Sequence, residues 1–189
     1  MNIPNILTLM RVALIPIFIL LYYLPFGWSY LAAAIIFTIA CVTDWLDGYL
    51  ARKWEQSTPF GAFLDPVADK LMVAVALVLL VQAHANFWVT APAMVIIGRE
   101  IVISALREWM AEIGARAQVA VSQLGKYKTA MTMVALIVLI ANTPVLTNWV
   151  ILGYVLLMLS AVLTLWSMFV YLKAAWPYMS MDVAEKNDE

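Results

Sequence analysis

The chain has 189 residues, of which 65% are hydrophobic, and a mean hydropathy of +0.91. A soluble domain is roughly half apolar, so this excess excludes an ordinary soluble fold and indicates one compact domain in the bilayer. The formal net charge of −1 gives no sign of a nucleic-acid partner, and we expect none. The single cysteine, Cys41, excludes an internal disulfide.

Hydrophobic runs follow one another along the chain, each about long enough to cross the hydrocarbon core as a helix. They cover residues 12–25, 30–50, 67–83, 88–110, 119–141 and 148–172. Before them, residues 2–10 mix asparagine, proline and threonine with apolar neighbours, which predicts a short helix at the membrane interface. We therefore expect an all-α integral membrane protein: six transmembrane helices plus this short N-terminal interfacial helix. One membrane domain would cover 1–176, and a polar C-terminal tail would cover 177–189, disordered from Met181.

The basic residues are distributed unevenly over the breaks between the hydrophobic runs. The breaks at 22–30, 84–88 and 142–148 contain no lysine or arginine. The other breaks carry Arg52 and Lys53, then Arg116, Lys126 and Lys128, and finally Lys173. By the positive-inside rule, this asymmetry places both termini in the cytoplasm.

Four aspartates stand out in a segment that otherwise resembles membrane. Asp44 and Asp47 are three residues apart and share one helix face, with Gly48 beside it. Further on, Gly61, Asp65 and Asp69 recur at four-residue intervals and form a second stripe. Two such helices side by side would direct four carboxylates into one cleft on the cytoplasmic side.

Carboxylates without nearby cysteine or histidine select Mg²⁺ or Mn²⁺. Four of them exceed what one Mg²⁺ usually takes from protein, which favours two ions, a recurrent arrangement in phosphate chemistry. Arg52 would then hold phosphate oxygens through its planar fork. Two other interpretations remain at this point: a buried ionic network with Arg52, Lys53 and Lys70, and a proton or ion pathway.

The spacing of these residues resembles a known family signature. The run from Asp44 to Asp69 matches D-x2-D-G-x2-A-R-x8-G-x3-D-x3-D, the signature of the CDP-alcohol phosphotransferase family, at every fixed position. Three further segments are similar to the branch of bacterial phosphatidylglycerophosphate synthases: Gly98–Ile101, Arg107–Trp109 and Gly125–Thr129. The family's opening pattern is similar to residues 4–11, so the resemblance covers nearly the whole chain.

This resemblance implies transfer of the phosphatidyl group from CDP-diacylglycerol to the 1-hydroxyl of sn-glycerol 3-phosphate, with release of CMP. It implies that the four aspartates bind two metal ions, and that Asp69 also takes the proton from the acceptor hydroxyl. The CDP-diacylglycerol pocket would be formed by Asn5, Thr8, Gly48, Arg52, Thr58 and Gly61. It further implies a homodimer in the bacterial cytoplasmic (inner) membrane, with the active site facing the cytoplasm.

The anionic acceptor needs its own basic residues. Arg99 and Arg107 are eight residues apart, or about 80° around one helix, so both could reach one phosphate; internal pairing with Glu100 or Glu108 is the alternative. Of the two lysines that the positive-inside bias also explains, the resemblance favours Lys126 over Lys128. Two other functions stay open: the same chemistry with another acceptor (inositol phosphate, serine or phosphatidylglycerol), and, more remotely, a divalent-cation transporter.

Overall fold

The computed structural model describes residues 3–54, 59–114 and 123–185, and it contains no strand within these ranges. The described helices, in chain order, are α1 (Ile3–Tyr23), α2 (Ser29–Trp54), α3 (Pro59–His84), α4 (Phe87–Glu112), α5 (Gln123–Ala141) and α6 (Asn148–Glu185). The prediction of an all-helical fold is confirmed.

Three of the described helices, α1, α4 and α6, are long and apolar enough to cross a membrane. Segments apolar and long enough to span a bilayer cover Ile6–Tyr23, Phe87–Glu112 and Asn148–Tyr178. Shorter apolar helical segments cover Ser29–Asp44 and Lys128–Ala141. These segments indicate a membrane protein, as the composition predicts.

Two boundaries differ from the predictions. The separate interfacial helix over 2–10 is wrong, because Ile3–Tyr23 is one continuous helix. Pro4 lies in the first turn of this helix, where a backbone amide would have no intrahelical partner, so the proline costs no hydrogen bond there. No helix-breaking residue follows before the apolar run. At the other end, the predicted disorder is wrong for residues 181–185, since α6 runs through Pro177 to Glu185; residues 186–189 lie outside the described part.

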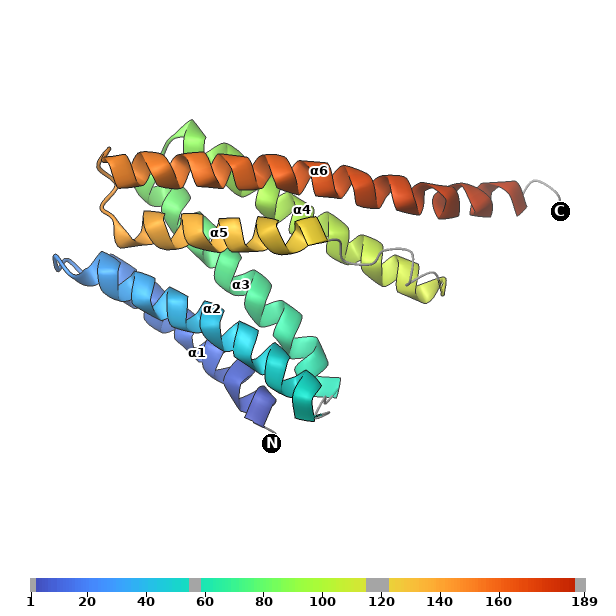
Figure 1. The fold of residues 1–189 in the computed structure, drawn as a ribbon, viewed down its shortest axis with the longest axis horizontal. Helices are drawn as coiled ribbons and strands as arrows, with labels where there is room; N and C mark the ends of the chain where they lie inside the picture. Colours follow the sequence, from blue (N-terminus) through green and yellow to red (C-terminus); the bar gives the residue numbers. More distant parts are fainter. Residues whose placement is uncertain (1–2, 55–58, 115–122, 186–189) are drawn as a thin grey trace.

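The helices form a bundle with two distinguishable ends (Figure 1). The turns that join α1 to α2, α3 to α4 and α5 to α6 lie at one end, and the chain termini lie at the other with the last turns of α2 and α4. Within the bundle, α1 packs mainly against α2, and α6 packs against both α4 and α5. Both ends of the described chain therefore lie toward the same end of the bundle.

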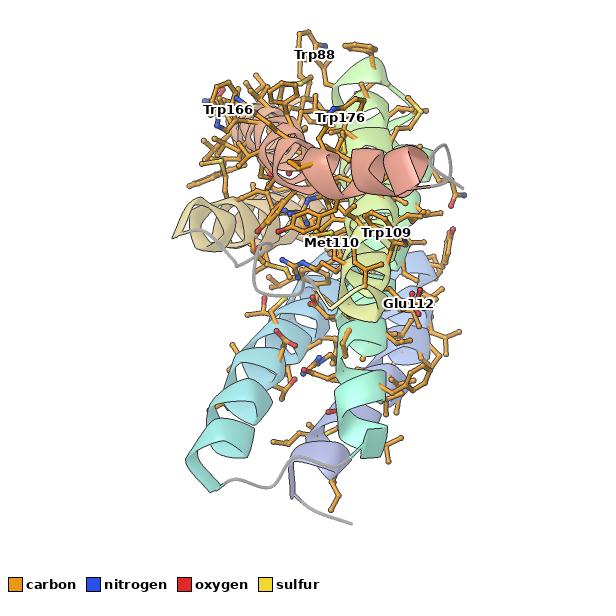
Figure 2. The ribbon with its side chains drawn as sticks, turned by 90° about the vertical axis from the view of Figure 1, so that its right-hand side faces the viewer. Trp88, Trp109, Met110, Glu112, Trp166 and Trp176 are labelled. Atoms are coloured by element: carbon orange, nitrogen blue, oxygen red, sulfur yellow. The ribbon has the colours of Figure 1, made fainter. Side chains whose placement is uncertain are left out.

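Two apolar clusters hold this arrangement. The larger one takes buried residues from all six described helices, among them Phe18, Phe37 and Leu80. The smaller one lies between α4 and α6 and contains Ile103, Leu106, Met110, Tyr171 and Ala175. Figure 2 shows Met110 beneath α6, whereas Trp166 points away from the bundle. The smaller cluster fixes how α4 presents its charged residues to α6.

The turn between α3 and α4 is held by polar contacts. Asn86 caps α4, accepting a hydrogen bond on its side chain from the Val89 amide at 3.2 Å. Its amide also donates to the Tyr154 hydroxyl at 2.9 Å, and that hydroxyl lies 2.8 Å from Nδ1 of His84. The contacts join this turn to α6.

We expect acid to destabilise the fold through His84. Burial lowers the pKa of this imidazole, and its Nε2 is buried without a hydrogen-bond partner among the described residues. Below about pH 6.5 the unfolded chain therefore binds more protons than the folded chain, so the free energy of unfolding falls as pH falls. Thermal unfolding in detergent at pH values from about 8 to about 5 measures this dependence. His84→Gln should flatten it; an unchanged slope in that variant would assign the dependence to other groups.

Candidate active site

Charged side chains from three helices meet in the half of the bundle nearer the chain termini. Nη1 of Arg11, on α1, lies 2.6 Å from Oδ1 of Asp44 on α2 and 3.2 Å from Oδ1 of Asp65 on α3. Arg11 is 1% exposed, whereas the two carboxylates are 37% and 45% exposed. Oxygens from two helices thus converge on one cationic atom.

Asp69 follows Asp65 by about one turn on the same helix. It lies close enough to Asp44, Asp65 and Arg11 to interact electrostatically with all of them. Asp69 also lines a cavity of about 660 Å³, so this cavity adjoins the acidic cluster.

The structure thus brings Asp44, Asp65 and Asp69 together, as the two predicted stripes require. Several other predicted site residues fall outside the described part: Thr58 entirely, and the side chains of Asn5, Asp47, Arg52 and Lys126, together with the surroundings of Gly48. In the predicted CDP-diacylglycerol pocket, Thr8 is buried one turn before Arg11, and Gly61 lies one turn before Asp65 on α3.

The cavity lies between α3, α4, α5 and α6, and its charged lining is predominantly basic. Four cationic side chains outnumber two acidic ones; the charged lining residues are Asp69, Lys70, Arg99, Glu100, Arg107 and Lys128. Both predicted arginines of α4 therefore reach the same cavity as Asp69, and Lys128 joins them from α5.

Glu100 pairs with two of these cations. Its Oε1 lies 2.6 Å from Nη1 of Arg99 and 3.6 Å from Nζ of Lys128. The charges of Arg99 and Arg107 both act on Lys128, so the three cations are close neighbours. The sequence left two roles open for Arg99: phosphate binding or pairing with Glu100. In the structure Arg99 pairs with Glu100 and also lines the cavity.

Two neutral side chains of the cavity wall contact its cations. Lys70 of α3 donates a hydrogen bond to the Ser104 hydroxyl of α4, which joins the two sides of the cavity. Tyr171 of α6 lies beneath both arginines: the guanidinium carbons of Arg99 and Arg107 are 5.8 Å and 5.6 Å from its ring centroid. Ring contacts of this kind attract cations without neutralising them.

Sequence reasoning missed Arg11 and Tyr171. Arg11 could have been found, because a charged residue within an apolar helix requires a partner, and the nearest abundant acids are the aspartates. No sequence signal pointed to Tyr171, an aromatic residue among many near the end of an apolar helix.

The acidic cluster fits a divalent cation by its donor chemistry. Two carboxylate oxygens already converge on one positive atom, and Mg²⁺ and Mn²⁺ prefer oxygen ligands of this type. Among the side chains that the structure describes, no three histidine, cysteine or acidic residues form a metal-binding group. The predicted set also includes Asp47, whose side chain lies outside the described part.

Comparison with known proteins decides the family. The sequence model of the CDP-alcohol phosphatidyltransferases matches residues 1–166. This chain belongs to that family. The resemblance seen in the aspartate signature is thereby confirmed. Divalent-metal dependence is typical of the family.

Curated relatives in the family share one name, CDP-diacylglycerol–glycerol-3-phosphate 3-phosphatidyltransferase. The protein from Pseudomonas fluorescens is 65% identical over 183 residues, which are 96% of this chain and 94% of the relative. The protein from Escherichia coli (strain K12) is 58% identical over 174 residues, 92% of this chain and 94% of the relative. A Shigella flexneri relative is 59% identical with the same coverage.

Proposed function

We propose that this chain transfers the phosphatidyl group from CDP-diacylglycerol to sn-glycerol 3-phosphate, giving phosphatidylglycerophosphate and CMP. The name shared by relatives at 58–65% identity supports the reaction. The observation that carries it in the structure is the cavity in which Asp69 and the cations of α4 and α5 line one space. Such a cavity suits an acceptor with a hydroxyl at one end and a phosphate at the other.

The donor would bind at the acidic cluster. Asp44, Asp47, Asp65 and Asp69 would hold two Mg²⁺ or Mn²⁺ ions, which when bound neutralise charge on the diphosphate and on the attacking and leaving oxygens. Arg52 would bind the diphosphate through its planar guanidinium. Gly48 and Gly61 would let the nucleotide approach the helices, with Asn5, Thr8 and Thr58 completing its pocket.

The acceptor would bind on the basic side of the cavity. Arg99 and Arg107 would bind the phosphate of glycerol 3-phosphate, with Lys126 as the lysine that the family resemblance favours. Lys128 lines the cavity and belongs in the same group. In this orientation the free 1-hydroxyl faces α3, where Asp69 accepts its proton as the oxygen attacks phosphorus.

The attack would be direct, without a phosphatidyl-enzyme. Between Asp44 and Asp69 the signature contains one serine and one threonine, Ser57 and Thr58, and no cysteine or histidine. A hydroxyl nucleophile of the protein would in addition need an adjacent base of its own. One base, Asp69, suffices for the direct route.

The topology follows from the charge distribution and the bundle. Six crossings with both termini in the cytoplasm would place the acidic cluster and the basic cavity near the cytoplasmic face of the bacterial inner membrane. The shared side of the two termini supports this arrangement. A soluble acceptor and CMP could then exchange with the cytoplasm, while the acyl chains remain in the bilayer. We also propose a homodimer.

The acceptor is tested by offering alternatives. Purified protein with CDP-diacylglycerol and Mg²⁺ should release CMP with glycerol 3-phosphate and much less with serine, inositol phosphate or phosphatidylglycerol. Preferred release with one of the other three would replace the acceptor and leave the family unchanged. Ion flux into vesicles without CMP release would favour a cation transporter instead.

Arg107→Ala should raise the KM for glycerol 3-phosphate by roughly tenfold to a hundredfold, because a charge-assisted hydrogen bond to the phosphate is lost. The KM for CDP-diacylglycerol should change little. Lys173→Ala, which removes an exposed cation from α6, is the matched control. Equal increases in both KM values for Arg107→Ala would assign the arginine a structural role.

A further inference from the structure

Arg107 reaches the cavity without a carboxylate to hold it. Arg99 is paired with Glu100, but no acidic side chain within the described residues forms an ion pair with Arg107. Its guanidinium lies instead 5.6 Å from the ring centroid of Tyr171. An exposed arginine has many rotamers, so a fixed neighbour is needed to keep this one directed at the cavity.

We propose that Tyr171 is a positioning residue for the acceptor phosphate: its ring holds the guanidinium groups of Arg99 and Arg107 at the cavity. The proposal rests on the function proposed above, in which these arginines bind that phosphate. Tyr171 itself lines the cavity, and it lies beyond residues 1–166, the part matched by the family's sequence model.

The ring is held firmly enough for this role. Tyr171 is 6% exposed and packs in the cluster with Ile103, Leu106 and Met110 of α4. The helix that carries the arginines therefore also carries the residues that fix the ring. Any shift of α6 against α4 would move the ring away from both guanidinium groups together.

An aromatic ring suits this position better than a carboxylate. A carboxylate would fix the arginine but would also neutralise it and compete with the incoming phosphate. The face of a tyrosine ring attracts a guanidinium through its quadrupole and leaves the positive charge in place. Two like charges beside one another repel, and a shared ring offsets part of that repulsion before the anion arrives.

Tyr171→Leu and Tyr171→Phe separate the ring from the hydroxyl. Leucine keeps an apolar side chain in the cluster but removes the π face, so the KM for glycerol 3-phosphate should rise roughly three- to thirtyfold. The KM for CDP-diacylglycerol should change little, while the Tm should fall because leucine leaves part of the buried ring's space empty. Phenylalanine keeps the face and should restore a wild-type KM. Phe169→Leu removes an exposed ring from the same helix and is the matched control.

Tyr171→Met serves if the leucine variant does not fold, because the longer, unbranched chain of methionine adapts to an irregular space. The inference is overturned if folded Tyr171→Leu or Tyr171→Met keeps a wild-type KM for glycerol 3-phosphate. It is also overturned if Tyr171→Phe is as impaired as Tyr171→Leu. Arg107→Ala, measured in parallel, distinguishes the role of Tyr171 from the assignment of the acceptor site. A raised KM in Arg107→Ala alone refutes only the role of Tyr171, whereas an unchanged KM in both refutes the acceptor assignment.

Discussion

Asp69→Asn is expected to lower kcat by about a thousandfold, within the range of general acid–base contributions. The amide cannot accept the proton of the acceptor hydroxyl, and an unaided alcohol is a poor nucleophile. Binding of CDP-diacylglycerol should be weakened but retained, since Asp44 and Asp65 still present carboxylates from α2 and α3. Release of CMP under saturating substrates measures the first effect, and equilibrium binding of labelled CDP-diacylglycerol measures the second.

Glu112→Gln is the matched control for this substitution, because it converts an exposed carboxylate at the end of α4 to the same amide. Its kcat should equal that of the wild type. If Asp69→Asn turned over normally, Asp69 could not be the base. If it bound no CDP-diacylglycerol, the loss of turnover would come from the donor site and would give no information on proton transfer.

Chelation of divalent ions with EDTA is expected to reduce CMP release to background, and added Mg²⁺ or Mn²⁺ should restore it. The donor carries a diphosphate, and without divalent ions the carboxylates of the cluster would repel it. A second readout does not depend on activity. Mn²⁺ titrated into the chelated protein should lose its free-ion EPR signal as it binds, with a break near two ions per chain if the predicted pair is correct.

Asp44→Asn combined with Asp65→Asn should remove most of that Mn²⁺ binding, whereas Glu112→Gln should leave it unchanged. Full activity in EDTA would refute the metal site. Undiminished binding in the double variant would place the ions elsewhere. Nη1 of Arg11 pairs with both substituted carboxylates, at 2.6 Å and 3.2 Å, so the double variant also removes these two ion pairs.

Much of the acidic half of the site could be predicted from the sequence. Helical periodicity places Asp65 and Asp69 on one face of their helix, and the same periodicity predicts that Asp44 shares a face of α2 with the next aspartate of the signature. The structure agrees in bringing Asp44 and Asp65 to one atom. Local spacing was sufficient here because each stripe belongs to a single helix.

The basic half could be predicted only in part. Spacing along one helix was a reason to select Arg99 and Arg107, but it could not identify the ring of Tyr171 beneath them. It likewise did not connect Glu100 to Lys128 across two helices. Contacts of this kind depend on how far one helix is rotated and shifted against the next, which no periodicity within either helix specifies.

Near both ends of the chain, the sequence predicted helix boundaries that the structure does not have. Polar and proline residues near Pro4 and Pro177 suggested breaks, yet both prolines lie inside continuous helices. Proline is tolerated in the first turn of a helix, whereas Pro177 lies inside α6 and removes one intrahelical hydrogen bond there.

The amino-acid sequence by itself determined that this is a helical membrane protein, which residues share a helix face, and to which family it belongs. These properties follow from hydrophobic length and from local spacing. Only the tertiary structure decided that Arg11 meets Asp44 and Asp65, that Glu100 joins Arg99 to Lys128, and that the ring of Tyr171 supports two arginines. Those contacts join residues far apart in the chain, and side-chain packing between helices, such as that of α4 on α6, sets their geometry.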